Sequence, residues 1–149
     1  MESIEFYIIR NQTCLRRNGI SKPLTPGDRE EITFILERMK RYFPQSIKRL
    51  YEWAADSAAN KMFFEYRVVD RFIRCNFGEA DFLYSDIEDG MFHFEEVKCP
   101  LRGICKDENV ICKPKADLGL PAEEQRVVRM YAKGYLPGEI AENLGKSCK

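Results

Sequence analysis

Apolar residues recur along the chain with two different periods, and together these predict an α+β, mainly helical protein. The run Ile4–Ile9 is rich in β-forming residues and predicts one N-terminal strand. The basic segment Arg10–Leu24 is predicted to be irregular. Between residues 25 and 78 the apolar positions follow a helical period, which predicts three helices with buried faces. Thr25-Pro26-Gly27-Asp28 is typical of a helix start, with Thr25 as N-cap, and Asn76-Phe77-Gly78 is typical of a helix end.

A β-hairpin is predicted after these helices. Asp89-Gly90 is a strong two-residue turn signal, and it separates Ala80–Glu88 from Met91–Val97. With this turn Glu88 faces Met91, and position 99 falls opposite position 80, near the end of the third helix. The acids of the hairpin, Asp86 and Glu95 among them, are expected to form a solvated face rather than a catalytic centre, because no phosphate-binding loop or nucleophile motif accompanies them.

Composition and charge narrow the functional classes. A net charge of zero over 149 residues argues against a protein that coats nucleic acid by bulk charge. No run of apolar residues is long enough for a signal peptide or a membrane span. We therefore expect a cytoplasmic protein whose cysteines are reduced. The basic residues concentrate towards the two ends of the chain, so any anion-binding surface is expected there.

Three cysteines lie within fourteen residues of a loop that follows the predicted hairpin. Five residues separate Cys99 from Cys105 and six separate Cys105 from Cys112, which matches no common zinc-finger spacing. The predicted hairpin returns Cys99 towards Cys75, at the end of the third helix. His93 is a poorer fourth ligand, because six residues of extended strand place it about 20 Å from Cys99.

The sequence therefore predicts a four-cysteine metal site formed by Cys75, Cys99, Cys105 and Cys112. Zinc is the preferred metal, and an iron–sulfur cluster uses the same ligands. The alternative is that these cysteines bind no metal and are small buried apolar residues. Cys14 and Cys148 have no partners in the sequence and are expected to be free thiols.

The last thirty residues carry the signals of two short helices joined by a tight turn. The first is predicted from about Pro121 to Lys133, Gly134 follows it, and the second begins near Pro137. This stretch resembles the LuxR/FixJ-type helix-turn-helix, which also occurs in region 4 of sigma factors. The resemblance spans residues 120–147 without a gap and is carried by Leu120, Glu124, Val127, Ala132, Gly134, Glu139, Ile140, Ala141, Leu144 and Ser147.

The resemblance implies double-stranded DNA as the partner. It also implies that Ser147 would cap the third, recognition helix, and that base-reading residues would follow Lys149, so that the motif is expected to be truncated here. Lys146, Ser147 and Lys149 are then the candidate phosphate contacts. Because phosphate contacts position a protein without specifying sequence, we expect weak and salt-dependent binding.

Two functional hypotheses remain. The first is a DNA-binding transcriptional regulator, or a fragment of one, with a metal-stapled helical domain over residues 1–115, a partial helix-turn-helix over 116–149, and a possible homodimeric state. The second is a metal-stapled protein-interaction module that does not bind DNA. An enzyme is not expected, and neither is contact with a membrane.

Overall fold

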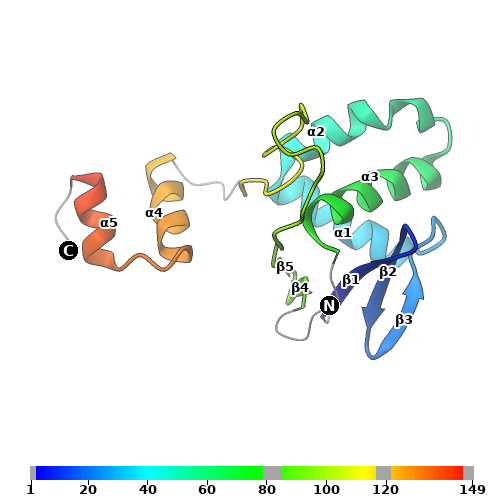
Figure 1. Ribbon diagram of the computed structural model, residues 1–149, viewed down its shortest axis with the longest axis horizontal. Helices are drawn as coiled ribbons and strands as arrows, with labels where there is room; N and C mark the ends of the chain where they lie inside the picture. The colour runs from blue at the N-terminus through cyan, green and yellow to red at the C-terminus, as the bar shows by residue number, and fades with distance from the viewer. Residues whose placement is uncertain (1–2, 79–84, 117–121, 146–149) are drawn as a thin grey trace. The chain divides into compact units, whose positions relative to one another are not determined.

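A computed structural model describes residues 3–78, 85–116 and 122–145 of this chain. The chain divides into two compact units, Met1–Ala116 and Asp117–Lys149, one residue from the boundary expected from the sequence. The first unit is an α+β unit, and the second contributes two short helices (Figure 1).

The α+β unit is built on an antiparallel sheet with strand order β3-β2-β1-β4-β5. Its strands are β1 (Ile4–Ile9), β2 (Gln12–Arg17), β3 (Ile20–Pro23), β4 (Ile87–Glu88) and β5 (Met91–Phe92). Each of its three hairpin turns has two central residues with positive φ: Arg10-Asn11, Asn18-Gly19 and Asp89-Gly90. Such turns have the twist that antiparallel strands need, so the chain reverses in two residues each time.

The sheet corrects the fold predicted from the sequence. The segment 10–24 is not irregular, because it forms β2 and β3, so that three strands rather than one precede the helices. The description of the chain as mainly helical is therefore wrong, as is the predicted order of elements. The physical reason is Asn18-Gly19, whose left-handed backbone closes the β2–β3 hairpin, while Leu15 pairs with Phe6 across β1 and β2 and is buried with it.

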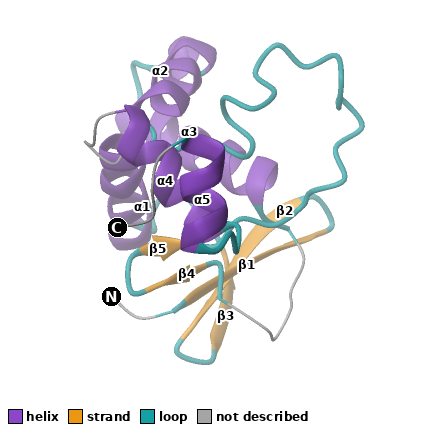
Figure 2. Ribbon diagram, turned by 90° about the vertical axis from the view of Figure 1, so that its left-hand side faces the viewer, coloured by secondary structure: helices purple, strands orange, loops and turns teal. Residues whose placement is uncertain are grey.

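Three helices lie on one side of this sheet (Figure 2). They are α1 (Arg29–Tyr42), α2 (Pro44–Trp53) and α3 (Lys61–Asn76), with a short 3-10 turn, η1 (Ala55–Ser57), before α3. Pro44 begins the second helix directly after the first, and the third ends at Asn76, as the sequence predicts. Their apolar faces join Ile4 and Phe6 of β1 in one core, to which α1 and α3 contribute Ile32, Ile35, Leu36, Met39, Val68, Val69, Phe72 and Ile73.

The start of α1 differs from the prediction. Thr25 does not cap the helix, because its backbone N–H and its hydroxyl both donate to the carboxylate of Asp28, at 2.7 and 3.0 Å. Residues 25–28 form a turn, and Asp28 is the N-cap of a helix that begins at Arg29. The carboxylate of Asp28 accepts the hydrogen bonds of Thr25, and the helix therefore begins about one turn later than Thr25-Pro26 predicts.

The predicted hairpin is present but far shorter than expected. Glu88 pairs with Met91, as the Asp89-Gly90 turn requires, and Ile87 pairs with Phe92. Beyond His93 the chain leaves its strand partner, and the N–H of Glu95 donates to the carbonyl of Asn76 at 2.9 Å. Phe92 and Phe94 instead pack on Phe43 and Phe72 of the core, with ring centroids 5.4 to 6.0 Å apart. Residues 79–84, where the first strand was predicted to begin, lie outside the described residues.

The second unit consists of α4 (Ala122–Ala132) and α5 (Pro137–Leu144), where the sequence predicts two short helices. Across the described parts of both units, no helix has the length and apolar character needed to cross a membrane.

Asn76 is a suitable point at which to test the fold. It is 1% exposed; its side-chain amide donates to the carbonyls of Phe72 and Ile111, and its oxygen accepts from the N–H of Lys113. Asn76→Ala leaves those loop groups without their partner, and we expect it to lower the free energy of unfolding by about 2–4 kcal/mol. Urea unfolding followed by the fluorescence of Trp53, the single tryptophan, measures this in the α+β unit.

Asn143→Ala is the matched control, because Asn143 is exposed on α5 and donates to a helix carbonyl only. It should change the unfolding midpoint very little. Equal midpoints for the two variants would show that Asn76 does not hold the loop.

Candidate functional site

Buried polar contacts hold the cysteine-bearing loop, residues 98–115, against α2 and α3. Asp107 is 4% exposed and forms ion pairs with Arg49 of α2 and Arg71 of α3, at 3.0 and 3.1 Å. The hydroxyl of Ser46 donates to the carbonyl of Val110, and the side chain of Ile111 enters the core. A buried carboxylate is stable here because two guanidinium groups neutralise it. The loop is therefore docked although it has no helix or strand of its own.

This docking places four cysteines around one cavity of about 330 Å³. Cys75 comes from the last turn of α3, and Cys99, Cys105 and Cys112 come from the loop. The structure thus brings together all four residues that the sequence proposed as metal ligands, whereas His93 does not line this cavity. Cys14 lies in β2, remote from the loop in the sequence and outside the lining. Metal binding itself stays a prediction.

The four thiols surround the cavity without closing on a single point. Among the described residues, one group of three potential ligand side chains has all its ligand atoms within 4.8 Å of one another, and that group contains no cysteine. Burial raises the pKa of Cys75; the guanidinium of Arg71 lowers it, and Cys112 and Cys99 raise it further. Cys75 is therefore a protonated thiol at neutral pH unless a cation displaces its proton.

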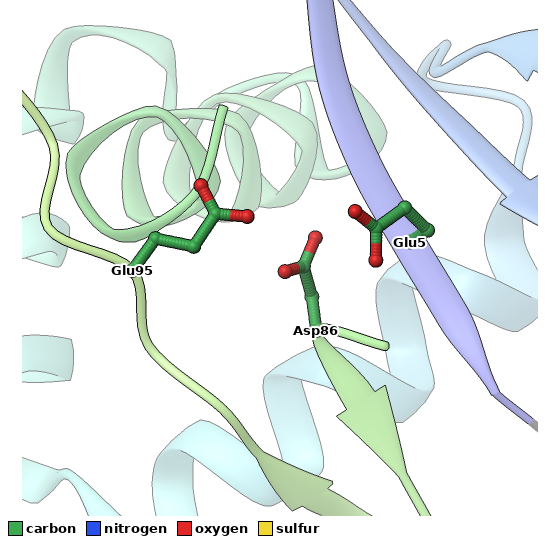
Figure 3. A group of neighbouring side chains, drawn as sticks. All are labelled: Glu5, Asp86 and Glu95. Carbon is green, nitrogen blue, oxygen red and sulfur yellow. The ribbon is translucent and has the colours of Figure 1, made fainter. Parts of the chain in front are cut away.

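The group that does converge is acidic and consists of Glu5, Asp86 and Glu95. Figure 3 shows Glu5 on β1, Asp86 just before β4 and Glu95 on the segment after β5, with their carboxyl groups directed towards one another. Glu5 and Asp86 are 4% and 2% exposed. One oxygen of Asp86 accepts the backbone N–H of Phe6 at 2.6 Å, which ties β4 to β1 beside their backbone pairing.

Burial raises the pKa of Asp86 to about 9. The N–H of Phe6 lowers it, whereas a hydrogen bond with Glu95 and the charges of Glu5 and Glu95 raise it further. At neutral pH the group therefore holds a proton between its carboxyls, which reduces the repulsion that three buried anions would create. Without a bound cation, the protonated Asp86 ties β1 to the segment before β4 through its bond to Phe6.

The sequence placed these acids wrongly. Asp86 does not belong to a solvated face, because β1 covers it on one side and the segment after β5 on the other. Glu5 was not singled out at all. Its alternation with Ile4 and Phe6 puts it on the opposite face of β1, but nothing local indicates a carboxyl partner eighty-one residues away.

The second unit consists of two short helices joined by a glycine-containing turn. After α4 the N–H of Gly134 donates to the carbonyl of Tyr131, and the N–H of Tyr135 donates to that of Met130, at 3.0 and 3.2 Å. With a φ of 92° at Gly134, these bonds form the Schellman motif that ends helices. Pro137 then occupies the first turn of α5, where the carboxylate of Glu139 accepts the N–H of Leu136 at 2.7 Å.

The described side chains of this unit are mostly exposed. Ile140, from the triplet that carries the family resemblance, is 6% exposed and packs inside, whereas Val128, Tyr131 and Leu136 are 42%, 69% and 65% exposed. Lys146, Ser147 and Lys149, the predicted phosphate contacts, lie outside the described residues.

Comparison of the chain with protein-family models, with curated proteins and with solved structures found no match. The helix-turn-helix resemblance therefore rests on the sequence of residues 120–147.

The raised pKa of Asp86 has a measurable consequence. The unfolded carboxyl ionises near its ordinary pKa of 3.8 and the folded one near 9, so between these values the folded state holds the extra proton. Stability then falls as pH rises through this window, with a slope of at most about 1.4 kcal/mol per pH unit from this group. Asp86→Asn, which keeps an acceptor for Phe6, should remove that part of the slope when urea unfolding is measured from pH 5 to 8.

Asp89→Asn is the control, because Asp89 is an exposed acid in the turn of the same hairpin. It should leave the pH profile unchanged. A wild-type slope retained in Asp86→Asn would mean that Asp86 is ionised in the folded protein.

Proposed function

We propose that this chain is a DNA-binding transcriptional regulator, or part of one, whose second unit is the scaffold of a LuxR-type helix-turn-helix. The observation that carries the proposal is the α4–turn–α5 arrangement, with the Schellman turn at Gly134 and the buried Ile140. Two short helices joined by a glycine-containing turn are the supersecondary unit that positions a recognition helix. The resemblance over residues 120–147 supplies the family.

The exposed apolar side chains of the unit support this proposal. Val128, Tyr131 and Leu136 face solvent over much of their surface, and exposed apolar side chains that lie close together are typical of a contact surface. In a helix-turn-helix the recognition helix packs on the two preceding helices. Such a helix, beginning at Ser147 as the resemblance implies, would cover apolar residues of this kind.

The net charge of the chain bears on how it would bind DNA. The net charge is zero, so bulk attraction to DNA contributes little. Lys146, Ser147 and Lys149 would contact phosphates at the start of the recognition helix. These phosphate contacts fix the position and orientation of the protein on DNA, while the recognition helix reads the bases. Binding to duplex DNA should therefore depend strongly on salt concentration.

The proposal includes a cytoplasmic location and a homodimer. Regulators of this kind act where the DNA is, and in bacteria that compartment also keeps thiols reduced. Twofold symmetry of a dimer matches the paired half-sites that helix-turn-helix proteins read. The α+β unit would then mediate dimerisation or receive a signal.

The second candidate function is a protein-interaction module. The observation that favours it is the tip of the cysteine-bearing loop, where Leu101 and Ile104 are 51% and 78% exposed. Exposed apolar residues on a docked loop are typical of a contact surface. A module of this kind would not bind duplex DNA at low salt, so the same experiment distinguishes the two functions.

DNA binding is tested by fluorescence anisotropy of a labelled duplex titrated with the 149-residue chain from about 20 to 200 mM salt. We expect binding at low salt that weakens steeply as salt rises. Lys146→Glu/Lys149→Glu should flatten the plot of log affinity against log salt by about two units, since each lost phosphate contact removes about 0.9. Lys40→Glu/Lys48→Glu, at exposed lysines of α1 and α2, changes the charge equally and should keep the slope. No binding at the lowest salt would contradict the proposal.

The turn is tested by a pair of glycine substitutions in the same unit. Gly134 has a φ of 92° and Gly138 has no positive φ, while an added Cβ would meet nothing within 4 Å at either position. Gly134→Ala should therefore destabilise α4 and α5 by about 1–2 kcal/mol through backbone conformation alone. Gly138→Ala, at the start of α5, should be neutral or stabilising. Hydrogen exchange of the α4 and α5 amides in the full chain measures both, and equal protection would mean that the turn at Gly134 is not required.

A further inference from the structure

The cavity lined by the cysteine-bearing loop is partly open to solvent. It measures about 330 Å³ and lies between the last turn of α3 and residues 97–112. Pockets that bind small molecules and cofactors in proteins have volumes from about 300 Å³ upwards. A cavity of this size lined by four thiols is therefore large enough for a cofactor of several atoms.

The spacing of the thiols indicates what that cofactor is. A zinc ion bound by four thiolates at about 2.3 Å in a tetrahedron holds the sulfurs about 3.8 Å from one another. No three of the four sulfurs lie within 4.8 Å of one another, although all four line the same cavity. An iron–sulfur cluster places iron and sulfide atoms between its ligands, so its four cysteine sulfurs stand farther apart and the centre is occupied.

We infer that Cys75, Cys99, Cys105 and Cys112 hold an iron–sulfur cluster in this cavity rather than a single zinc ion. The thiols lose their protons as the cluster binds, and the four thiolates become its ligands. The inference concerns the α+β unit and is independent of the DNA-binding proposal.

The charges around the cavity suit a cluster with four thiolates, which is an anion. Arg71 lines the cavity together with Cys75, and Arg102 donates to the sulfur of Cys112 at 3.8 Å. The backbone N–H of Asn109 also donates to Cys112, at 3.3 Å. Arg74 and Lys98 line the same cavity. Hydrogen bonds to ligand sulfurs are one of the means by which proteins stabilise such clusters and set their potential.

The loop reaches this arrangement through contacts that do not involve the thiols. Asp107 is bound by Arg49 and Arg71, and the carbonyl of Ile111 is bound by Asn76. These contacts lie between Cys105 and Cys112 and fix the loop relative to Cys75. The ligands are thus held around an open space by the surrounding fold, which is the preorganisation that a multi-atom cofactor requires.

The experiment measures the metal content of the whole 149-residue chain, purified without oxygen and then reconstituted with ferric iron, sulfide and a dithiol, which supplies the electrons that a mixed-valence cluster needs. We expect iron and acid-labile sulfide in equal amounts, bound stoichiometrically to the chain, and visible charge-transfer absorption that dithionite bleaches. A parallel sample receives zinc alone. Stoichiometric zinc with no uptake of iron and sulfide would overturn the inference, and so would the absence of any bound metal.

Single substitutions then assign the ligands. Cys99→Ser and Cys105→Ser should each lose most of the iron and the visible absorption. Cys14→Ser is the matched control, since it makes the same change at a buried cysteine of β2 and should keep the iron content of the wild type. Far-UV circular dichroism checks that each variant is folded. Equal iron loss in Cys14→Ser and Cys105→Ser would contradict the assignment, and the wild-type analysis decides the question even if a ligand variant does not fold.

Discussion

The α+β unit depends on the hydrogen bonds that the backbone N–H and carbonyl groups make after the end of β5. A chain that leaves a sheet must satisfy its N–H and carbonyl groups elsewhere if it remains buried. Here the end of α3 supplies the partners: the carbonyl of Asn76 accepts from Glu95, and its side chain bonds to Ile111 and Lys113. One residue at a helix terminus thus joins the segment after the hairpin to the far end of the cysteine-bearing loop. The positions of Cys75 and Cys99 beside one cavity follow from this.

The carboxyl cluster and the cysteine cluster of this unit differ in how their side chains are arranged. Asp86, beside Glu5 and Glu95, keeps its proton at neutral pH, which lowers the repulsion among the three carboxyl groups without a cation among the contacts described for Asp86. The thiols leave a space open and are surrounded by arginines, two of which also bind acids at its rim: Arg71 pairs with Asp107, and Arg102 with Glu108. The first arrangement favours a structural role for the acids. The second favours a bound group for the cysteines.

The sequence predicted the elements whose signals are local. The strand Ile4–Ile9, the helix end at Asn76, the register at Asp89-Gly90 and the two helices of the second unit all depend on a few adjacent residues, and the structure has them. Asn18-Gly19 carries the same hairpin signal as Asp89-Gly90 and was overlooked in a segment whose basic residues suggested a loop. The hairpin strands were predicted too long because alternation extends to Val97, while tertiary packing of Phe92 and Phe94 ends the pairing after two residues.

The candidate sites were predictable only in part, because the residues that form them lie far apart in the sequence. The grouping of Cys75 with the loop cysteines followed from the hairpin direction, although the path from Glu95 to Cys99 is a segment along α3 rather than a strand. The spacing of the thiols around a cavity, on which the inferred cluster rests, depends on Asp107 and Asn76 and has no local signature. The partnership of Glu5 with Asp86 likewise depends on the pairing of β1 with β4.

The two units also differ in what stabilises them, and this bears on DNA binding. The α+β unit has a shared aromatic and aliphatic core, whereas among the described side chains of the second unit only Ile140 is buried. Helices of this length are marginal in water, so α4 and α5 rely on local devices: Pro137 and Glu139 at a helix start, Gly134 and Gly145 at helix ends. A partner that binds only the folded helices adds its binding free energy to their small free energy of unfolding. Duplex DNA should therefore protect the α4 and α5 amides from hydrogen exchange more than it protects those of the sheet.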